Sequence, residues 1–498
     1  MASNQNKKME IEERATSLHP AIVFSDDFPL CVDLDGTLIS TDSLAESWLA
    51  AMRRSPWRCL GASLALLRGR SHFKTALADI FVPSADQFPY RQEVLHLLEQ
   101  EAVAGRVLVL ATGASRLVAT AIASHLGYFT AVLSSDTGVN LTSRSKAQEL
   151  ENRFGRGQFY YVGNSAADLP AWQSSAGAVV VGRRTLARKL SVSGVPVLGE
   201  FPGNRLSLAL IAQSLRVHQW SKNLLVFVAI LLGHRFRDAS AWITATILFS
   251  AMSLVASVAY LVNDLFDLEA DRVHPEKRKR PFASGTLGVM LGVAGIPLLL
   301  LVAAGLSAFL PLSSRLWLCG YLALALVYTF VLKEKLLIDV FVLAGLYTLR
   351  VLAGGSATGI EISPWTLAFS MFLFLSLAMA KRYSELISSA QTIASLPRRN
   401  YYRSDLTMLG SLGTASGYIA VLVLALYIHA PEVASLYRQP WLLWGICPLA
   451  AYWISRVWVF ASRAALPGDP ILFAFRDRVS YLVGGLCVLL FLLAALLH

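Results

Sequence analysis

The chain has 498 residues, which is long enough for two or more domains. It is 55% hydrophobic and only 15% charged, which excludes an ordinary soluble composition for the whole chain. Its formal net charge of +11 is typical of nucleic-acid binding, of anionic substrates or of the cytoplasmic loops of membrane proteins. Because many cations lie between apolar segments, we expect a membrane and anionic ligands, and no nucleic-acid partner.

The chain divides into three segments of different composition. Residues 1–20 form a polar N-terminal tail, residues 21–200 have the composition of a soluble domain, and residues 205–498 carry one apolar run after another. The breaker cluster Pro202-Gly203-Asn204 suits the boundary between the last two. The first 30 residues lack the apolar core of a signal peptide, so we expect the N-terminal domain to stay in the cytoplasm.

An apolar strand that ends in two aspartates indicates phosphate chemistry in the soluble domain. Asp33 and Asp35 follow the run Pro29–Val32 and are two residues apart, so both side chains reach the end of the same strand. One carboxylate can attack phosphorus and the other can protonate the leaving oxygen, while Mg²⁺ neutralises the phosphate.

Three further polar residues follow later strands or open helices of this domain. Thr112 ends an apolar run, Lys146 opens a helical stretch, and Asp168 lies in the loop after another apolar run. Alternating strands and helices predict a doubly wound parallel sheet, at whose carboxyl edge these side chains meet the two aspartates.

These four motifs, in this order, resemble the haloacid dehalogenase (HAD) superfamily over roughly residues 25–200. The resemblance implies an α/β, HAD-like Rossmannoid phosphatase domain with a helical cap at about residues 43–103. It implies Asp33 as nucleophile, Asp35 as general acid and base, Thr112 and Lys146 as phosphate ligands, and Asp33, Asp35 and Asp168 as the residues around Mg²⁺. Asn164 stands where many members carry a metal-binding aspartate. An inactive regulatory domain is therefore the alternative to an active phosphatase.

Apolar segments of the second half predict an all-α polytopic membrane domain of about nine transmembrane helices. Each segment is long or apolar enough to cross a bilayer. The segments are 207–232, 240–264, 284–310, 314–332, 336–357, 363–380, 410–430, 439–461 and 479–498. Lysine and arginine gather in alternate loops and are scarce in the loops between them, which agrees with a cytoplasmic N-terminus.

Carboxylates cluster where the second of these segments leaves the bilayer. Asp264, Asp267 and Asp271 recur at i, i+3 and i+7, and Asn263 lies four residues before Asp267, so on one helix these groups share a face. Such carboxylates repel one another unless a cation joins them. Mg²⁺ commonly bridges protein carboxylates to substrate phosphates, so we expect Mg²⁺ as the cofactor of this site.

Further polar residues lie among the later segments. Tyr328, Lys333 and Asp339 lie around the junction of the fourth and fifth segments, and Lys381 and Arg382 follow the sixth. Asp339 and Arg350 lie within an otherwise apolar helix, so we expect both to face the interior of the bundle. They are about three helical turns apart, which argues against direct pairing.

Across roughly residues 207–498 the chain resembles the UbiA superfamily of intramembrane transferases. The motif from Asn263 to Asp271 matches the first aspartate-rich motif of that family, whereas the second is reduced here to the region from Tyr328 to Asp339. The resemblance implies that Mg²⁺ binds a diphosphate and assists its departure, usually from a prenyl chain. The reduced second motif departs from the pattern of an ordinary prenyl diphosphate site.

Four stretches resemble the decaprenyl-phosphate phosphoribosyltransferase subfamily more closely. They are Gln219–Asn223, Tyr260–Asp264, His274–Pro281 and Lys381–Glu385. This resemblance implies transfer of a phosphoribosyl group from phosphoribosyl pyrophosphate to polyprenyl phosphate. The cations that would serve a site holding several phosphates are Lys222, Lys277, Arg280, Lys333, Lys381 and Arg382.

We therefore expect a Mg²⁺-dependent transferase in a bacterial inner membrane, whose fused HAD domain removes the 5-phosphate that the product keeps. Transfer of a prenyl chain from prenyl diphosphate to an aromatic or lipid acceptor is the alternative enzyme. A transporter or scaffold with an inactive HAD domain is the alternative of another class. The sequence leaves the donor, the acceptor lipid and homo-oligomerisation open.

Overall fold

The computed structural model describes residues 22–136, 140–182, 184–204, 206–389, 400–434, 437–466 and 470–496. The predicted polar tail, residues 1–20, lies outside the described residues. The described residues form two compact units. The first unit runs up to Ser214 and also includes Asp264–Ala294, and the second combines Leu215–Asn263 with the described residues from Gly295 onward.

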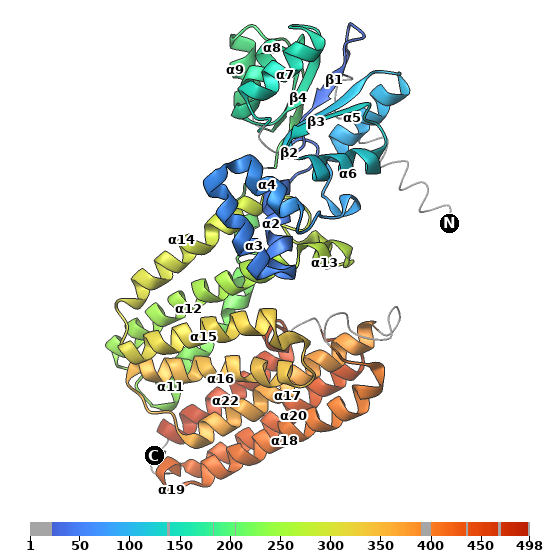
Figure 1. Ribbon diagram of the computed structural model, residues 1–498. Helices are drawn as coiled ribbons and strands as arrows, with labels where there is room; N and C mark the ends of the chain where they lie inside the picture. The colour runs from blue at the N-terminus through green and yellow to red at the C-terminus, as the bar shows by residue number, and fades with distance from the viewer. Residues whose placement is uncertain are drawn as a thin grey trace. The chain divides into compact units, whose positions relative to one another are not determined.

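A six-stranded parallel sheet forms the centre of the first unit (Figure 1). Its strands are β1 (Leu30–Val32), β2 (Leu108–Ser115), β3 (Ala131–Ser135), β4 (Tyr160–Gly163), β5 (Gly177–Gly182) and β6 (Val197–Pro202). They lie in the order β3-β2-β1-β4-β5-β6, so the direction of strand addition reverses at β1. Ligands of doubly wound folds bind outside the carboxyl ends of the strands at such a reversal.

Alternate residues of each strand pack on opposite faces of this sheet. Leu30 and Val32 lie in one hydrophobic cluster with α5 (Gln92–Val103) and α6 (Arg116–Leu126). Cys31 lies in the other, with side chains from three helices. Those helices are α7 (Arg144–Phe154), α8 (Leu169–Ser174) and α9 (Arg184–Val192). Because strand side chains point alternately to the two faces, a sheet with both faces covered needs continuous apolar runs, and the doubly wound fold is confirmed.

A small helical cap follows β1. It contains α2 (Ser43–Arg54), α3 (Pro56–Ser63), η1 (Leu64–Arg68), α4 (Arg70–Ala78) and η2 (Ala85–Gln87). The Asp42 side chain caps α2 by accepting a hydrogen bond from the Ala45 N–H at 2.8 Å. Pro56 lies in the first turn of α3, where a backbone N–H would have no partner within the helix. The cap has its own hydrophobic cluster, whereas α5 packs on the sheet.

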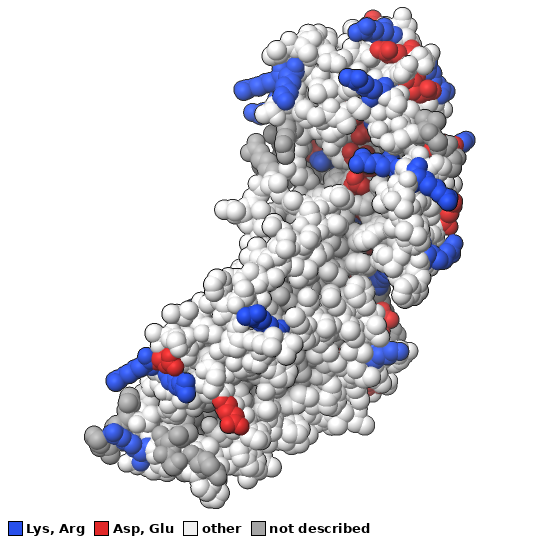
Figure 2. Space-filling view, turned by 60° about the vertical axis from the view of Figure 1, so that its left-hand side comes forward, with Lys and Arg blue, Asp and Glu red and all other residues white. Residues whose placement is uncertain are grey.

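Eight helices among the described residues are long and apolar enough to cross a membrane. The long helices are α12 (Ala239–Phe266), α14 (Val289–Ser307), α15 (Leu312–Phe330), α16 (Ile338–Thr358), α17 (Pro364–Ser389), α18 (Leu406–His429), α20 (Ile446–Ser462) and α22 (Arg478–Leu496), with η8 (Pro440–Gly445) extending α20. Short elements between them are α13 (Leu268–Val273), η5 (Lys277–Lys279), η6 (Leu332–Glu334), η7 (Arg403–Asp405), α19 (Pro431–Ala434) and α21 (Pro470–Ala474). On the face drawn in Figure 2 the surface of the long helices is mostly free of charged residues, as contact with lipid requires.

The expected first span, residues 207–232, is not one long helix. It is divided into α10 (Leu208–Ser214), the 3₁₀ helix η4 (Val217–Phe227) and α11 (Val228–Leu232). Arg216, with a left-handed φ of 50°, interrupts the helical conformation between α10 and η4. The side chains of Lys222 and Asn223 in η4 are polar and buried. The eight long helices agree with the prediction of about nine spans, and the difference lies at residues 207–232. Hydrophobic length alone does not reveal a break that places polar groups in the interior.

A glycine allows η4 to lie directly on α16. A Cβ atom at Gly354 would stand 2.1 Å from the carbonyl oxygen of Val226, so the backbone of η4 and the surface of α16 leave no room for a larger residue. This close approach holds Asn223 where its amide donates to Ser253 at 2.9 Å and its oxygen accepts from Arg350 at 2.7 Å.

Candidate functional site

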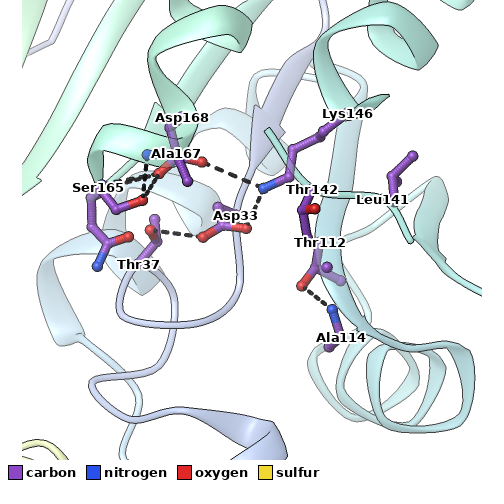
Figure 3. Close-up of polar contacts among 12 residues, drawn as sticks. Asp33, Thr37, Thr112, Ala114, Leu141, Thr142, Lys146, Ser165, Ala167 and Asp168 are labelled. Carbon is purple, nitrogen blue, oxygen red and sulfur yellow. Dashed lines mark hydrogen bonds and ion pairs between the residues drawn. The ribbon is translucent and has the colours of Figure 1, made fainter. Parts of the chain in front are cut away.

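The first candidate site lies at the carboxyl edge of the sheet, where strand order reverses. Asp33 follows β1, and its carboxylate accepts a hydrogen bond from Lys146 Nζ at 2.7 Å (Figure 3). The same ammonium donates to the hydroxyl of Tyr161 at 2.9 Å and to Asp168 Oδ1 at 3.4 Å. Burial alone would lower the pKa of Lys146, but the carboxylates of Asp33 and Asp168 outweigh it and raise that pKa. The structure therefore joins three of the predicted residues through one charged lysine.

Asp168 is held rigidly in the loop after β4. Its Oδ2 accepts the N–H groups of Asn164 at 3.1 Å and Ser165 at 3.0 Å, and the Ser165 hydroxyl at 3.1 Å. Its Oδ1 accepts the Tyr161 hydroxyl at 2.9 Å. Tyr161 was not predicted as a site residue because an aromatic residue in a buried strand looks like core. The alternation of side chains between the two faces of the sheet is the one signal in the sequence that could have placed Tyr161 on the same face as Cys31.

Asp35 and Thr112 complete the predicted set at this edge. Asp35 Oδ1 accepts the N–H of Ser43 at the start of α2 at 2.7 Å, and the buried Thr112 accepts the N–H of Ala114 at 3.0 Å. Burial raises the pKa of Asp33 to about 6, and burial with the nearby charge of Asp42 raises the pKa of Asp35 to about 7. Near neutral pH this favours an ionised Asp33 beside a protonated Asp35, the division of roles that a nucleophile and a general acid require.

A second group of carboxylates lies in the segment Asp264–Ala294. Asp264 and Asp271 are both buried, and Arg280 Nη1 contacts Asp264 Oδ1 at 3.1 Å and Asp271 Oδ2 at 2.5 Å. Burial raises the pKa of Asp271, whereas the charges of Arg280 and Lys277 act in the opposite direction. Arg280 was predicted to hold an anionic substrate, and in this structure it holds the two carboxylates instead.

Asp267 does not share the face of its two neighbours. Helix α12 ends at Phe266, and Asp267 leaves the helical conformation with φ −99° and ψ 11° before α13 begins. Its carboxylate accepts from Arg53 Nη1 of the cap at 2.8 Å, and the same nitrogen donates to the Phe266 carbonyl at 2.6 Å. The prediction of one helical face was wrong because the helix ends here, where its last carbonyls need outside donors that Arg53 supplies.

The second unit brings together residues of three long helices, α15, α16 and α17. Asp339 accepts from Arg382 Nε at 2.6 Å and from the Tyr401 hydroxyl at 2.5 Å, and Arg382 also donates to the Tyr328 hydroxyl at 3.2 Å. Lys381 is the residue before Arg382 and is half-buried. Tyr401 was not predicted as a site residue. It lies more than sixty residues after Asp339 in the sequence, so nothing local indicates that the two side chains meet.

Two further lysines of this unit lie among polar and aromatic groups. Lys333 Nζ lies 3.3 Å from the side-chain oxygen of Asn263. Lys222 is buried, with Nζ 5.6 Å from the ring centre of Tyr347. Arg350 donates to Asn223 at 2.7 Å and to the Tyr321 hydroxyl at 2.8 Å. As expected, Asp339 and Arg350 are both buried and have different partners.

The donor chemistry of both carboxylate groups fits a hard divalent cation. In the part of the chain that the structure describes, no three His, Cys, Asp or Glu side chains converge closely enough to hold a metal ion. In each group a cation instead joins two carboxylates: Lys146 joins Asp33 and Asp168, and Arg280 joins Asp264 and Asp271. Buried carboxylates require such neutralisation, and Mg²⁺ prefers these oxygen ligands.

Two parts of the chain each match the model of a known protein family. Residues 224–479, just over half of the chain, match the model of the UbiA prenyltransferase family. The chain belongs to the UbiA prenyltransferase family. Residues 30–173 match the model of haloacid dehalogenase-like hydrolases, so a HAD-like domain precedes the UbiA domain. With eight apolar helices of sufficient length in the part of the chain that the structure describes, this UbiA-family protein is a multi-pass membrane protein.

Three relatives cover different parts of the chain. The uncharacterized protein y4nM of Sinorhizobium fredii is 39% identical over 95% of this chain and 92% of its own length. The nodulation protein NoeC of Azorhizobium caulinodans is 36% identical over 54% of this chain and 87% of its own length. The decaprenyl-phosphate phosphoribosyltransferase of Mycobacterium tuberculosis is 33% identical over 55% of this chain and 90% of its own length. The UbiA domain is thus related to a phosphoribosyltransferase.

Proposed function

We propose that the UbiA domain transfers a phosphoribosyl group from phosphoribosyl pyrophosphate to polyprenyl phosphate, at the cytoplasmic face of a bacterial inner membrane. The observation that carries this proposal is the 33% identity to decaprenyl-phosphate phosphoribosyltransferase over 90% of that relative's length. The supply of cations supports it, because pyrophosphate, ribose 5-phosphate and lipid phosphate all need positive partners.

Asp264, Asp267 and Asp271 are the residues that would hold Mg²⁺, which when bound neutralises the charge that develops on the departing pyrophosphate. Arg280 would then be released from the two carboxylates that it joins and would become available to a phosphate. Lys222 and Lys381 would orient the lipid phosphate, whose oxygen attacks the anomeric carbon of the ribose as the bond to pyrophosphate breaks. The chain needs no nucleophile of its own for this step.

The second unit also has an apolar groove that a hydrocarbon chain could bind. A groove of about 560 Å³ is lined almost entirely by apolar side chains of α17, α18, α20, α22 and neighbouring short elements, including Tyr427, Trp453 and Phe491. Such a groove suits the apolar part of a lipid acceptor.

We propose that the HAD domain removes the 5-phosphate from the ribose of the product. Asp33 Oδ would attack phosphorus, the bond from phosphorus to the ribose oxygen would break, and Asp35 would protonate that oxygen. Water would then release phosphate from Asp33. Fusion to the transferase raises the effective concentration of this product at the phosphatase.

The test of the transferase uses the full-length protein in detergent with Mg²⁺, polyprenyl phosphate and labelled phosphoribosyl pyrophosphate. We expect label in the lipid fraction with the unmutated protein and none with Asp264→Ala. Absence of label, with consumption of prenyl diphosphate and an aromatic acceptor, would instead assign prenyl transfer. In the same assay Asp33→Asn should accumulate the 5-phosphorylated lipid, and an unchanged ratio of phosphorylated to dephosphorylated lipid would refute the phosphatase step.

A further inference from the structure

The segment Asp264–Ala294 belongs to the same compact unit as the HAD domain. It contacts the cap helix α2 through hydrogen bonds of its side chains. The guanidinium of Arg272 binds the carboxylate of Glu46 with both terminal nitrogens, at 2.7 and 2.6 Å. The two side chains are 9% and 5% exposed. Two parallel bonds in a buried setting fix the orientation of the segment against α2 as well as its distance.

A second contact lies at Gly285 and brings the backbone onto the HAD domain. Gly285 has a φ of +71°, and a Cβ atom there would stand 2.0 Å from Ser40 Oγ and 2.9 Å from Pro89 Cβ. Its carbonyl accepts from the side chain of Asn204 at 2.6 Å. Only glycine combines this conformation with so close an approach. The aspartate-rich segment is therefore held on the HAD domain at two separate places.

A third contact joins α2 to a predicted metal ligand of the transferase. Arg53 Nη1 lies 2.8 Å from Asp267 Oδ1, and the side chains are 27% and 15% exposed. The same nitrogen donates to the Phe266 carbonyl at 2.6 Å, so two hydrogen bonds fix the guanidinium beside Asp267 Oδ1. A cation that binds Oδ1 from this side must displace the guanidinium. Arg53 and a divalent cation therefore cannot both bind Asp267 Oδ1 from this side.

We propose that the cap of the HAD domain controls metal loading of the transferase, because Arg53 competes with the divalent cation for Asp267. This inference rests on the proposed metal-assisted transfer. A carboxylate bound to a guanidinium offers less negative charge to a second cation, so the docked cap lowers the affinity for metal. The coupling is reciprocal, and metal bound at Asp267 weakens the hold of α2 on the segment. The phosphatase cap would then be released when the transferase is ready to work.

The test measures Mn²⁺ binding by electron paramagnetic resonance, which does not depend on turnover. It uses the full-length protein in detergent with Asp33→Asn and Asp35→Asn in every sample, to remove the phosphatase metal site. The site under study is the one that Asp264→Ala abolishes. We expect Arg53→Ala to tighten Mn²⁺ binding there about fivefold, because an ion pair of this exposure is worth about 1 kcal/mol. Arg53→Lys, which keeps the charge, should stay near the parent.

Arg54→Ala is the matched control. Arg54 is the next residue of α2 and pairs with Glu269 at 3.1 Å, with 44% and 29% of the side chains exposed, so its loss should leave Mn²⁺ binding unchanged. Unchanged or weaker binding in Arg53→Ala would overturn the inference while the proposed transfer stands. Absence of any Asp264-dependent Mn²⁺ site would overturn both. If Arg53→Ala does not fold, Arg53→Gln supplies the uncharged variant with a donor left for the Phe266 carbonyl.

Discussion

Arg382 Nε and Asp339 Oδ2 lie 2.6 Å apart in an ion pair whose side chains are 1% and 0% exposed, and which joins α17 to α16. Arg382 also pairs with the partly exposed Glu385 at 2.5 Å, so removing Asp339 costs less than the about 3–5 kcal/mol of a fully uncompensated buried charge. We expect Asp339→Ala to lower the apparent melting temperature in detergent by several degrees. Arg235→Ala is the control, because Arg235 pairs with Asp238 at the surface and such pairs contribute about 1 kcal/mol or less. Equal melting of the two variants would show that the buried pair does not hold the helices.

The two raised pKa values of the HAD site predict a bell-shaped pH profile for phosphate ester hydrolysis. Asp33, with a pKa of about 6, must be ionised to attack, so activity falls as the pH drops below that value. Asp35, with a pKa of about 7, must be protonated to act as an acid, so activity falls above it. We expect a maximum between about pH 6 and 7 for p-nitrophenyl phosphate, and an acid limb that moves to lower pH as Mg²⁺ rises. A flat profile from pH 5 to 9 would contradict these roles.

A lysine of the cap predicts a substrate with a second anionic group. Lys74 of α4 donates to the Gly113 carbonyl at 2.5 Å and to Asn140 Oδ1 at 2.9 Å, and burial lowers its pKa. Among the described residues it makes no ion pair with a carboxylate, although a half-buried cation gains most from an anion. Loss of a charge-assisted bond costs about 1.5–3 kcal/mol, so Lys74→Ala should raise KM for fructose 1,6-bisphosphate at least about tenfold.

Two further measurements give this prediction its control. With p-nitrophenyl phosphate, which carries one anionic group, Lys74→Ala should keep kcat within about twofold of the unmutated protein. Lys189→Ala, at an exposed lysine of α9, should leave KM and kcat unchanged for both substrates. A parallel loss with both substrates would mean that Lys74 only fastens the cap to the sheet.

Two glycines of α16 provide a matched pair for the packing of η4. A methyl group at Gly354 would meet the Val226 carbonyl oxygen at 2.1 Å, whereas nothing lies within 4 Å of one at Gly345. We expect Gly354→Ala to push η4 away from α16 and to lower both melting temperature and transfer activity. Gly345→Ala should be neutral or slightly stabilising, since alanine favours a helix over glycine by about 1 kcal/mol. If both variants behave alike, the close approach of η4 is not needed.

Pattern and motif predicted the sheet and most of the first site, because strand ends in a parallel sheet must meet at one edge. Asp33, Lys146 and Asp168 therefore meet as expected, although more than one hundred residues separate the first two. Hydrophobic length predicted the long helices equally well. It failed at residues 207–232, where buried polar groups rather than length decide the backbone path.

The partners of the aspartate-rich segment were beyond sequence reasoning. Asp264, Asp267 and Asp271 look equivalent by spacing, but the end of α12 separates Asp267 from the other two. Its partner Arg53 lies more than two hundred residues earlier, in a helix whose exposed arginines resemble an ordinary solvated face. Nothing local to either residue marks the pairing, which depends on tertiary packing.

The ion pair of Glu46 with Arg272 has a consequence for how this gene can evolve. Losing one of the two side chains while the HAD domain is present would leave the charge of the other buried without its partner, at a cost of about 3–5 kcal/mol. A single change at Glu46 or at Arg272 is therefore harmful, and the pair can be replaced only when both positions change. Each residue thus penalises the loss of the other, although no site of either activity requires this pair.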